Sequence, residues 1–145
     1  MNGMTPIVKK TTQLIVGFIF LYGIYVVTHG HLTPGGGFAG GAIIAGAFIL
    51  LVLAFGSDIL KLKKREEGSS VAESSGILIF LMLAFAALFI GTKVFFANYL
   101  PKGTIGELIS AGVIPLYNIA VGIEVAAALF TIFLALVIYK EEVLK

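Results

Sequence analysis

The residue most able to do chemistry in this sequence is Glu124, which lies about two turns into an apolar run. Ionisable residues inside membrane spans are costly and usually line water-filled paths or proton relays. Residues three or four apart share a helix face, and the face of Glu124 carries small or polar residues: Ala120, Val121, Ala127, Ala128, Thr131 and Ala135. This seam predicts that Glu124 faces protein and contacts a proton or a cation. A structural carboxyl, bonded to a neighbouring helix or hydrated near the surface, is the alternative.

Thr131 and Lys93 could extend a polar path from Glu124. Thr131 lies roughly 10 Å further along the same face at about 1.5 Å per residue, too far to share one ligand shell. Lys93 is expected about one turn from the end of the third membrane span, at about 75–97. There its aliphatic stem could extend so that the charged amine reaches the membrane surface. The rival interpretation of Lys93 is a counter-charge for Glu124. Hard cations take oxygen ligands, so we expect at most a transient Na⁺ near Glu124 and no firm metal site.

His29 and His31 form an H-x-H pair in a short loop. Imidazole titrates near physiological pH and can bind metal. Two ligands alone make a poor metal site, and alternate spacing does not suit one face of a helix. We therefore interpret both as surface or turn-stabilising histidines, and a role in proton entry stays open as the alternative.

The histidines open the segment HGHLTPGGGFAGG, residues 29–41, which holds six of the eighteen glycines. Glycine permits backbone angles and close approaches that other residues forbid. Two pairs have G-x-x-x-G spacing, which lets helix backbones meet closely in a membrane: Gly36 with Gly40, and Gly37 with Gly41. The segment predicts a tight turn at a membrane surface. It lacks the lysine and serine or threonine of a phosphate loop and the pattern of a dinucleotide loop.

Two further features concern the start of residues 38–55, which we expect to be the second membrane span. Thr33 and Pro34 are most simply a cap with proline at or near the first turn of the following helix. Ala39, Ala42 and Gly46 follow one helix face, which we expect to pack against another helix.

The composition indicates an integral membrane protein. The chain has 145 residues, of which 59% are hydrophobic and 12% charged, with a mean hydropathy of +1.06. Soluble domains average about 45–50% apolar and about 25% charged. A net charge of +2 and the lack of a basic tract argue against nucleic acid. Because the sequence has no cysteine, disulfides, thiolate zinc sites and directly ligated iron–sulfur clusters are excluded. We expect no cofactor, and any electron transfer would belong to another subunit.

We predict a single all-α domain over residues 1–145, with four spans at about 7–28, 38–55, 75–97 and 116–139. Asn118 opens the fourth span, where it would cap the helix or bond across helices. Basic residues gather at the N-terminus, in the loop after the second span and at the C-terminus. Since cytoplasmic loops are enriched in Lys and Arg, both termini are expected in the cytoplasm, and the protein is expected in the cell membrane.

The sequence also resembles a known family. GHLTPGGGFAGG is similar to the GH-x-TPGGGF-x-GG signature of the MnhB/MrpB subunit of Mrp-type multisubunit sodium/proton antiporters, and GTKVFF and PLYNIAVGIEVAAALF resemble further parts of that family. The resemblance covers nearly the whole chain. The residues that match the signature are His31, Thr33, Pro34, Gly35, Gly36, Gly37, Phe38, Gly40 and Gly41.

This resemblance implies a four-span subunit that is not an enzyme by itself, set among other membrane subunits in the lipid bilayer. The assembly would exchange Na⁺ for H⁺, or would form the Mrp-like sodium-translocating module of a membrane-bound hydrogenase-type oxidoreductase complex. Asn118 stands where many antiporter members have aspartate, and Glu124 lies further along the same helix, which favours the hydrogenase-type or archaeal branch. The alternative is a structural assembly subunit without direct ion contact. A self-contained small transporter is a third possibility.

Overall fold

The described part of the molecule is entirely helical and loop structure. The computed structural model describes residues 3–56, 62–90 and 93–143. Within them lie four helices: α1 (Pro6–Thr28), α2 (Gly37–Phe55), α4 (Leu62–Phe89) and α5 (Ile114–Val143). Each is long and apolar enough to cross a membrane, and the described residues include no strand. The predicted all-α, four-span fold class is confirmed.

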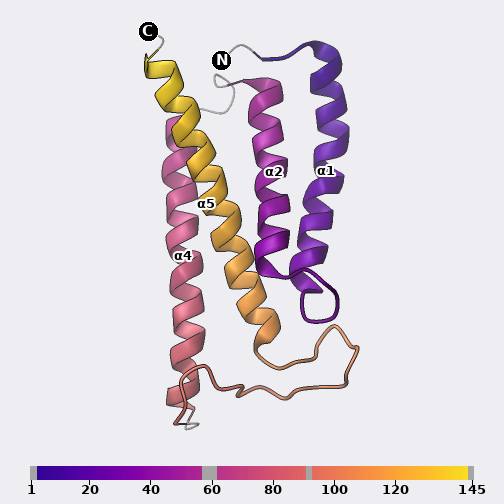
Figure 1. Ribbon diagram of the computed structural model, residues 1–145, viewed down its shortest axis with the longest axis vertical. Coiled ribbons are helices and arrows are strands. Elements are labelled where there is room, and N and C mark those ends of the chain that lie inside the picture. Colours follow the sequence, from indigo (N-terminus) through magenta and orange to yellow (C-terminus); the bar gives the residue numbers. More distant parts are fainter. Residues whose placement is uncertain (1–2, 57–61, 91–92, 144–145) are drawn as a thin grey trace.

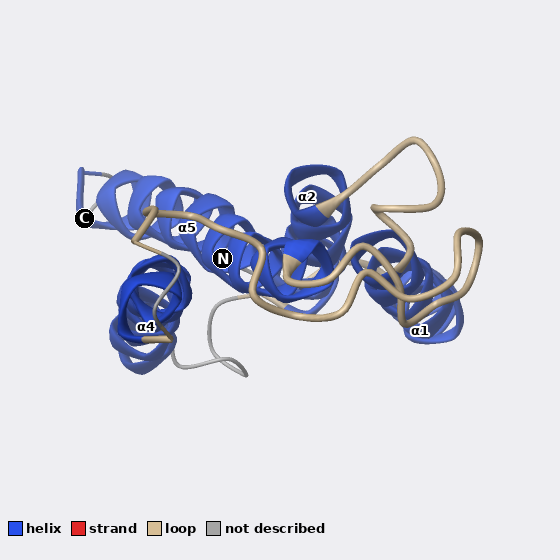
Figure 2. Cartoon of the chain, turned by 90° about the horizontal axis from the view of Figure 1, so that it is seen from below, coloured by secondary structure: helices blue, strands red, loops and turns tan. Residues whose placement is uncertain are grey.

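The helices are arranged as a row, in the spatial order α1, α2, α5, α4 (Figures 1 and 2). α1 and α2 run in opposite directions, as do α5 and α4, whereas α2 and α5 run in the same direction (Figure 1). The start of α1 and the end of α5 lie at the same end of the molecule (Figure 1). Among the described helices, α4 packs against α5 alone. The last helix of the chain is therefore the one that joins α4 to the others.

The third span differs from its predicted bounds of about 75–97. α4 begins at Leu62 and ends at Phe89. Because Lys, Arg and Glu are good helix formers, the helix extends backward through the charged segment that was expected to be a solvated loop. It passes through Gly68 without a break.

The serines near residue 75 and the loop after α4 also show that α4 lies earlier in the sequence than the predicted third span. Ser74 and Ser75, near the predicted start of the third span at about residue 75, donate hydrogen bonds to the carbonyls of Ser70 and Ala72 within the helix. Beyond its end, Lys93 and Phe96 have φ of 56° and 61°, which α-helical geometry does not allow.

Close backbone contacts hold α2 between its two neighbours. On one side a Cβ at Gly40 would lie 2.8 Å from the carbonyl oxygen of Gly23 on α1. On the other side a Cβ at Gly41 would lie 2.7 Å from the carbonyl oxygen of Gly122 on α5. Real Cβ atoms are not found at such distances, so only glycine lets these backbones approach. This is the close packing that the G-x-x-x-G spacing predicts.

A small apolar core lies further along the contact between α2 and α5. It consists of Val52, Phe130, Leu134 and Val137, with Leu134 and Val52 fully buried. Phe130 thus faces α2, and so does Val121, whose Cβ lies 2.8 Å from the position that a Cβ of Gly37 would take. The predicted packing face of α2 is not continuous, because Gly46 is exposed with nothing near its Cβ position.

The loop between α4 and α5 is fixed by Asn98. Its Oδ1 accepts hydrogen bonds from the backbone N–H groups of Leu100 (3.3 Å) and Val113 (3.2 Å), next to the start of α5. The N–H of Ala111 donates to the carbonyl of Lys102 at 2.8 Å. The loop is thereby held against the helix ends, while Ile105 and Ile109 project outward with 102% and 88% exposure.

The arrangement makes a topological prediction. The segment before α1 and the loop between α4 and α5 lie at opposite ends of the molecule (Figure 1). Met4 in the first and Ile105 in the second are exposed, so a single cysteine at each should react with a membrane-impermeant maleimide from opposite sides. The positive-inside rule predicts that Met4 is on the cytoplasmic side. The chain has no native cysteine, so the labelling background is low. Labelling of both positions from one side would contradict four spans.

The glycine contacts make a packing prediction. Gly41→Ala should destabilise the fold by about 1–3 kcal/mol, the usual range for overpacking a filled contact. Gly46→Ala on the same helix is the matched control, because its Cβ would meet nothing within 4 Å. Thermal unfolding of the purified protein measures both. Equal stability of the two variants would show that Gly41 does not set the spacing between helices.

Candidate functional site

Glu124 lies at a close backbone contact between α5 and α4. A Cβ at Gly76 of α4 would lie 2.8 Å from Cβ of Glu124 and 2.9 Å from its backbone nitrogen. The glycine therefore lets α4 rest directly on the backbone of the glutamate. Glu124 is half-buried. The predicted small-residue seam thus faces another helix at this point, and that helix is α4.

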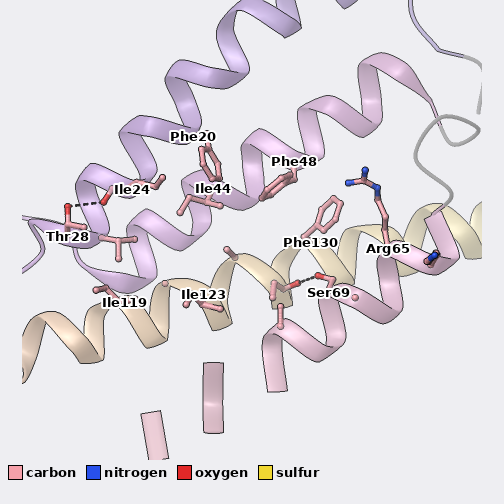
Figure 3. Close-up of a pocket in the computed structure, with 17 residues that line it drawn as sticks. Phe20, Ile24, Thr28, Ile44, Phe48, Arg65, Ser69, Ile119, Ile123 and Phe130 are labelled. Atoms are coloured by element: carbon pink, nitrogen blue, oxygen red, sulfur yellow. Dashed lines mark hydrogen bonds between the residues drawn. The ribbon is translucent and has the colours of Figure 1, made fainter. Parts of the chain in front are cut away.

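Two hydroxyl groups meet one turn away from Glu124. Ser69 Oγ of α4 donates to the carbonyl of Ala127 on α5 at 2.9 Å, a contact drawn in Figure 3. Thr131 Oγ1 donates to the same carbonyl at 2.9 Å. Since Ala127 follows Glu124 by three residues, the carbonyl lies roughly 4.5 Å further along the helix axis. The seam between α4 and α5 thus holds a carboxyl, two hydroxyls and a backbone carbonyl that accepts a hydrogen bond from each hydroxyl.

Ser69 is the site residue that the sequence analysis missed. It was assigned to a solvated loop because it follows a charged run. One signal could have found it: Ser69 and Gly76 are about two helical turns apart, and the fully buried Ala84 and Ala87 lie near the same helix face further along. A stripe of small residues that begins before the apolar run indicates that the helix begins there too.

The structure does not bring Lys93 and Glu124 together. Glu124 contacts α4 at Gly76, thirteen residues before the helix ends at Phe89. At about 1.5 Å per residue this separates them by roughly 20 Å along the axis, and Lys93 lies beyond that end, exposed in the loop. The counter-charge interpretation is therefore wrong for this conformation, and the expectation that Lys93 lies within a span is wrong as well.

His29 stabilises the turn that follows α1. Its Nδ1 lies 3.0 Å from the carbonyl of Tyr25, and its ring stacks on the Tyr25 ring at a centroid distance of 4.0 Å. Its own carbonyl accepts the backbone N–H groups of Leu32 and Thr33. These contacts favour the turn-stabilising interpretation.

His31 lies in the same turn, half-buried. Its two ring nitrogens are shielded and have no hydrogen-bond partner among the described residues. Neither histidine belongs to the seam between α4 and α5. In the described part of the chain, no group of three or more His, Asp or Glu side chains could hold a metal ion.

The turn between α1 and α2, here called the glycine turn (residues 29–36), packs against the start of α5. Asn118 Nδ2 lies 2.9 Å from the position that a Cβ of Gly30 would take, and its Oδ1 lies 3.6 Å from that of Gly36. Asn118 is the fifth residue of α5 and does not cap it. Its side-chain amide instead packs on the turn between α1 and α2, so Asn118 contributes to the contacts between α5 and the other helices.

Thr33 and Pro34 do not cap α2 as expected. Thr33 Oγ1 donates to the carbonyl of His29 at 3.2 Å, so it closes the turn after α1. The residue that precedes α2 is Gly36, with φ of 116° and no side-chain cap. Gly35 also has a positive φ, of 156°. Phe38, one residue into the helix, is 68% exposed and faces outward.

These features define a class of protein: a multi-pass helical membrane protein whose spans are joined by glycine contacts. The particular family follows from comparison. Residues 7–131 match the family described as a domain related to the MnhB subunit of Na⁺/H⁺ antiporters, and the chain belongs to this family. Members are subunits of antiporter complexes and are not catalytic by themselves.

Relatives occur in archaea and bacteria. An uncharacterized protein of Methanocaldococcus jannaschii, MJ1307, is 44% identical over 137 residues, covering 88% of this chain and 50% of the relative. A protein of Staphylococcus haemolyticus named as antiporter subunit mnhB2 is 31% identical over 133 residues, covering 90% and 92%.

A solved structure is similar as well. A chain in the structure of the membrane-bound sulfane sulfur reductase, an archaeal respiratory membrane complex, matches with a TM-score of 0.72 and 34% identity. The match covers 88% of this chain and 56% of that one. The chain thus spans about half the length of the M. jannaschii relative and of the chain in this structure.

The contact at Gly76 makes a prediction about the site. Gly76→Ala should separate α4 from Glu124 and destabilise the fold by about 1–3 kcal/mol. Gly68→Ala on the same helix is the control, because nothing lies within 4 Å of its Cβ position and alanine favours a helix by about 1 kcal/mol over glycine. Thermal unfolding should separate the two variants. A Gly76→Ala protein as stable as Gly68→Ala would show that the two backbones are not in contact.

Proposed function

We propose that the chain is an integral subunit of an Mrp-like multisubunit cation/proton-translocating membrane complex, and that Glu124 contacts the translocated ion or proton. Membership of the MnhB family supports the first part. The name of the staphylococcal relative points to antiporter assemblies, and the archaeal structure is that of a respiratory membrane complex. Other membrane subunits are the partners in this proposal, with Na⁺ and H⁺ as the ions.

The observation that carries the ion contact is the polar content of the seam between α4 and α5. Glu124 stands against Gly76, and hydroxyls from both helices bond to the Ala127 carbonyl one turn away. Polar groups in a membrane span are expensive to bury without partners. A seam of helix contact built only for packing would not need three such side chains.

The available ligands suit a hard cation in transit. Na⁺ takes oxygen ligands, as other hard cations do, and the carboxylate of Glu124 supplies the charge. Ser69 and Thr131 use their protons on Ala127, so their oxygens can still accept or coordinate. These oxygens are spread over about two helical turns, so they form successive steps of a path and not one closed shell. Water or a neighbouring subunit would complete each step.

A structural role for Glu124 is the competing function. The observation that favours it is the tight backbone contact with Gly76, which would hold α4 whether or not an ion passes. Under this alternative the carboxyl only satisfies hydrogen bonds between subunits. Removing its charge while keeping its shape distinguishes the two.

We expect Glu124→Gln to leave the complex assembled, because glutamine keeps the size and hydrogen-bonding capacity of the side chain. Sodium-dependent transport by the complex should fall by about tenfold or more, at least the usual cost of disturbing a metal ligand's surroundings. The measurement is ²²Na⁺ flux in proteoliposomes that contain the purified complex.

Glu67→Gln is the matched control, since it makes the same chemical change at an exposed position of α4. It should leave the flux unchanged. Wild-type flux in an intact Glu124→Gln complex would reduce Glu124 to a structural carboxyl and would leave the family assignment untouched.

A further inference from the structure

A groove of about 980 Å³ runs along one face of the helix row. Side chains of α1 and α2 form one wall, the first turns of α4 form the other, and α5 forms the floor (Figure 3). Most of the lining is apolar, including Phe20, Ile24, Ile44, Phe48, Ile123 and Phe130. The groove exists because α4 packs only on α5, which leaves an open space between α4 and α1.

The groove is charged at one end only. Lys64 and Arg65, both exposed, line it where α4 begins, and Figure 3 shows Arg65 beside it. The described residues that line the groove include no carboxylate. The neighbouring Glu66 and Glu67 are not among the lining residues. The end of the groove near the start of α4 therefore carries two basic side chains, and the rest of the lining is mostly apolar, with Thr28 and Ser69 as its polar residues.

The length of the groove fits a lipid tail better than a helix. On α5 it extends from Ile119 to Phe130, eleven residues or roughly 16 Å at about 1.5 Å per residue. This is about half of the ~30 Å hydrocarbon thickness, the length of acyl chains in one leaflet. A spanning helix of a partner subunit would need a trough along the full thickness and about 10 Å wide.

We propose that this groove binds an anionic phospholipid, with its acyl chains between α1 and α4 and its phosphate on Lys64 and Arg65. Basic pockets between membrane helices are known to hold acidic headgroups. The bound lipid fills the space that the row of helices leaves open. The groove shares Ser69 and Ala127 with the seam between α4 and α5. Glu124 itself does not line the groove, and lipid binding there does not depend on ion translocation.

The test is native mass spectrometry of the purified full chain in detergent, titrated with equal amounts of phosphatidylglycerol and phosphatidylcholine. The wild-type protein should retain phosphatidylglycerol about twenty-fivefold more than phosphatidylcholine, since each of the two basic residues near an anionic headgroup contributes about fivefold. The double variant Lys64→Gln/Arg65→Gln should lose this preference. Lys102→Gln/Lys140→Gln, which removes two exposed basic residues outside the groove, should keep it.

A second variant tests the apolar part. Ala126→Phe places a large ring in the groove lining and should reduce retention of both lipids. Equal retention of the two lipids by the wild type would overturn the proposal, as would an unchanged preference in Lys64→Gln/Arg65→Gln. A cysteine at Ile123 that cross-links to a helix of another subunit in the assembled complex, with no phospholipid retained, would also overturn it and would assign the groove to a protein partner.

Discussion

The structure depends on the distance at which α2 meets its neighbours. In a membrane the lipid tails are as apolar as the side chains, so helices associate through close packing and hydrogen bonds and not through the hydrophobic effect. Gly40 and Gly41, adjacent in sequence, face opposite ways and bring α2 against Gly23 of α1 and Gly122 of α5. Val27 of α1 lies against the Cβ positions of both Gly40 and Gly122. Three helices are thereby fixed to one another near the glycine turn.

The distance between α2 and α5 determines which face of α5 remains to contact α4. With one side of α5 committed to α2 through Gly122 and the core at Leu134, its remaining small-residue face is turned to α4. The attachment of α4 then combines the Gly76 contact, the Ser69 hydrogen bond, and the rings of Phe80 and Tyr117 at a centroid distance of 5.1 Å. Because this is the only described helix contact of α4, the polar seam and the open groove have the same origin.

The sequence predicted the fold class and the glycine contacts better than the ends of α4. Hydropathy locates an apolar run, but a helix continues wherever its residues form helix and find a partner. Ser69 was missed for this reason, and Lys93 was placed in a span that ends before it. The small residues on the face of Glu124 can be counted in the sequence and predict a helix contact there, and Cβ of Glu124 lies against Gly76 of α4. Which helix it would face could not be deduced, because that depends on the order of the row.

The arrangement of the helices also explains why the structure of the glycine turn could not be predicted from its local sequence. Thr33 and Pro34 have the pattern of a helix start, yet Thr33 bonds backward to His29. Asn118, more than eighty residues further along the chain, packs on this turn at Gly30 and Gly36. Such long-range contacts are not visible in local spacing. The same applies to Phe130, whose burial against Val52 follows from the position of α2.

The central claim is that Glu124 is a carboxyl within reach of a transported cation. Its most direct test is the rate at which a hydrophobic carbodiimide modifies Glu124 in the assembled complex, followed by mass spectrometry of the peptide that contains it. Bound Na⁺ should protect the carboxylate, so we predict that modification slows with increasing Na⁺ and does not slow with choline at equal ionic strength. A rate independent of Na⁺, with Glu124 fully reactive, would contradict the account.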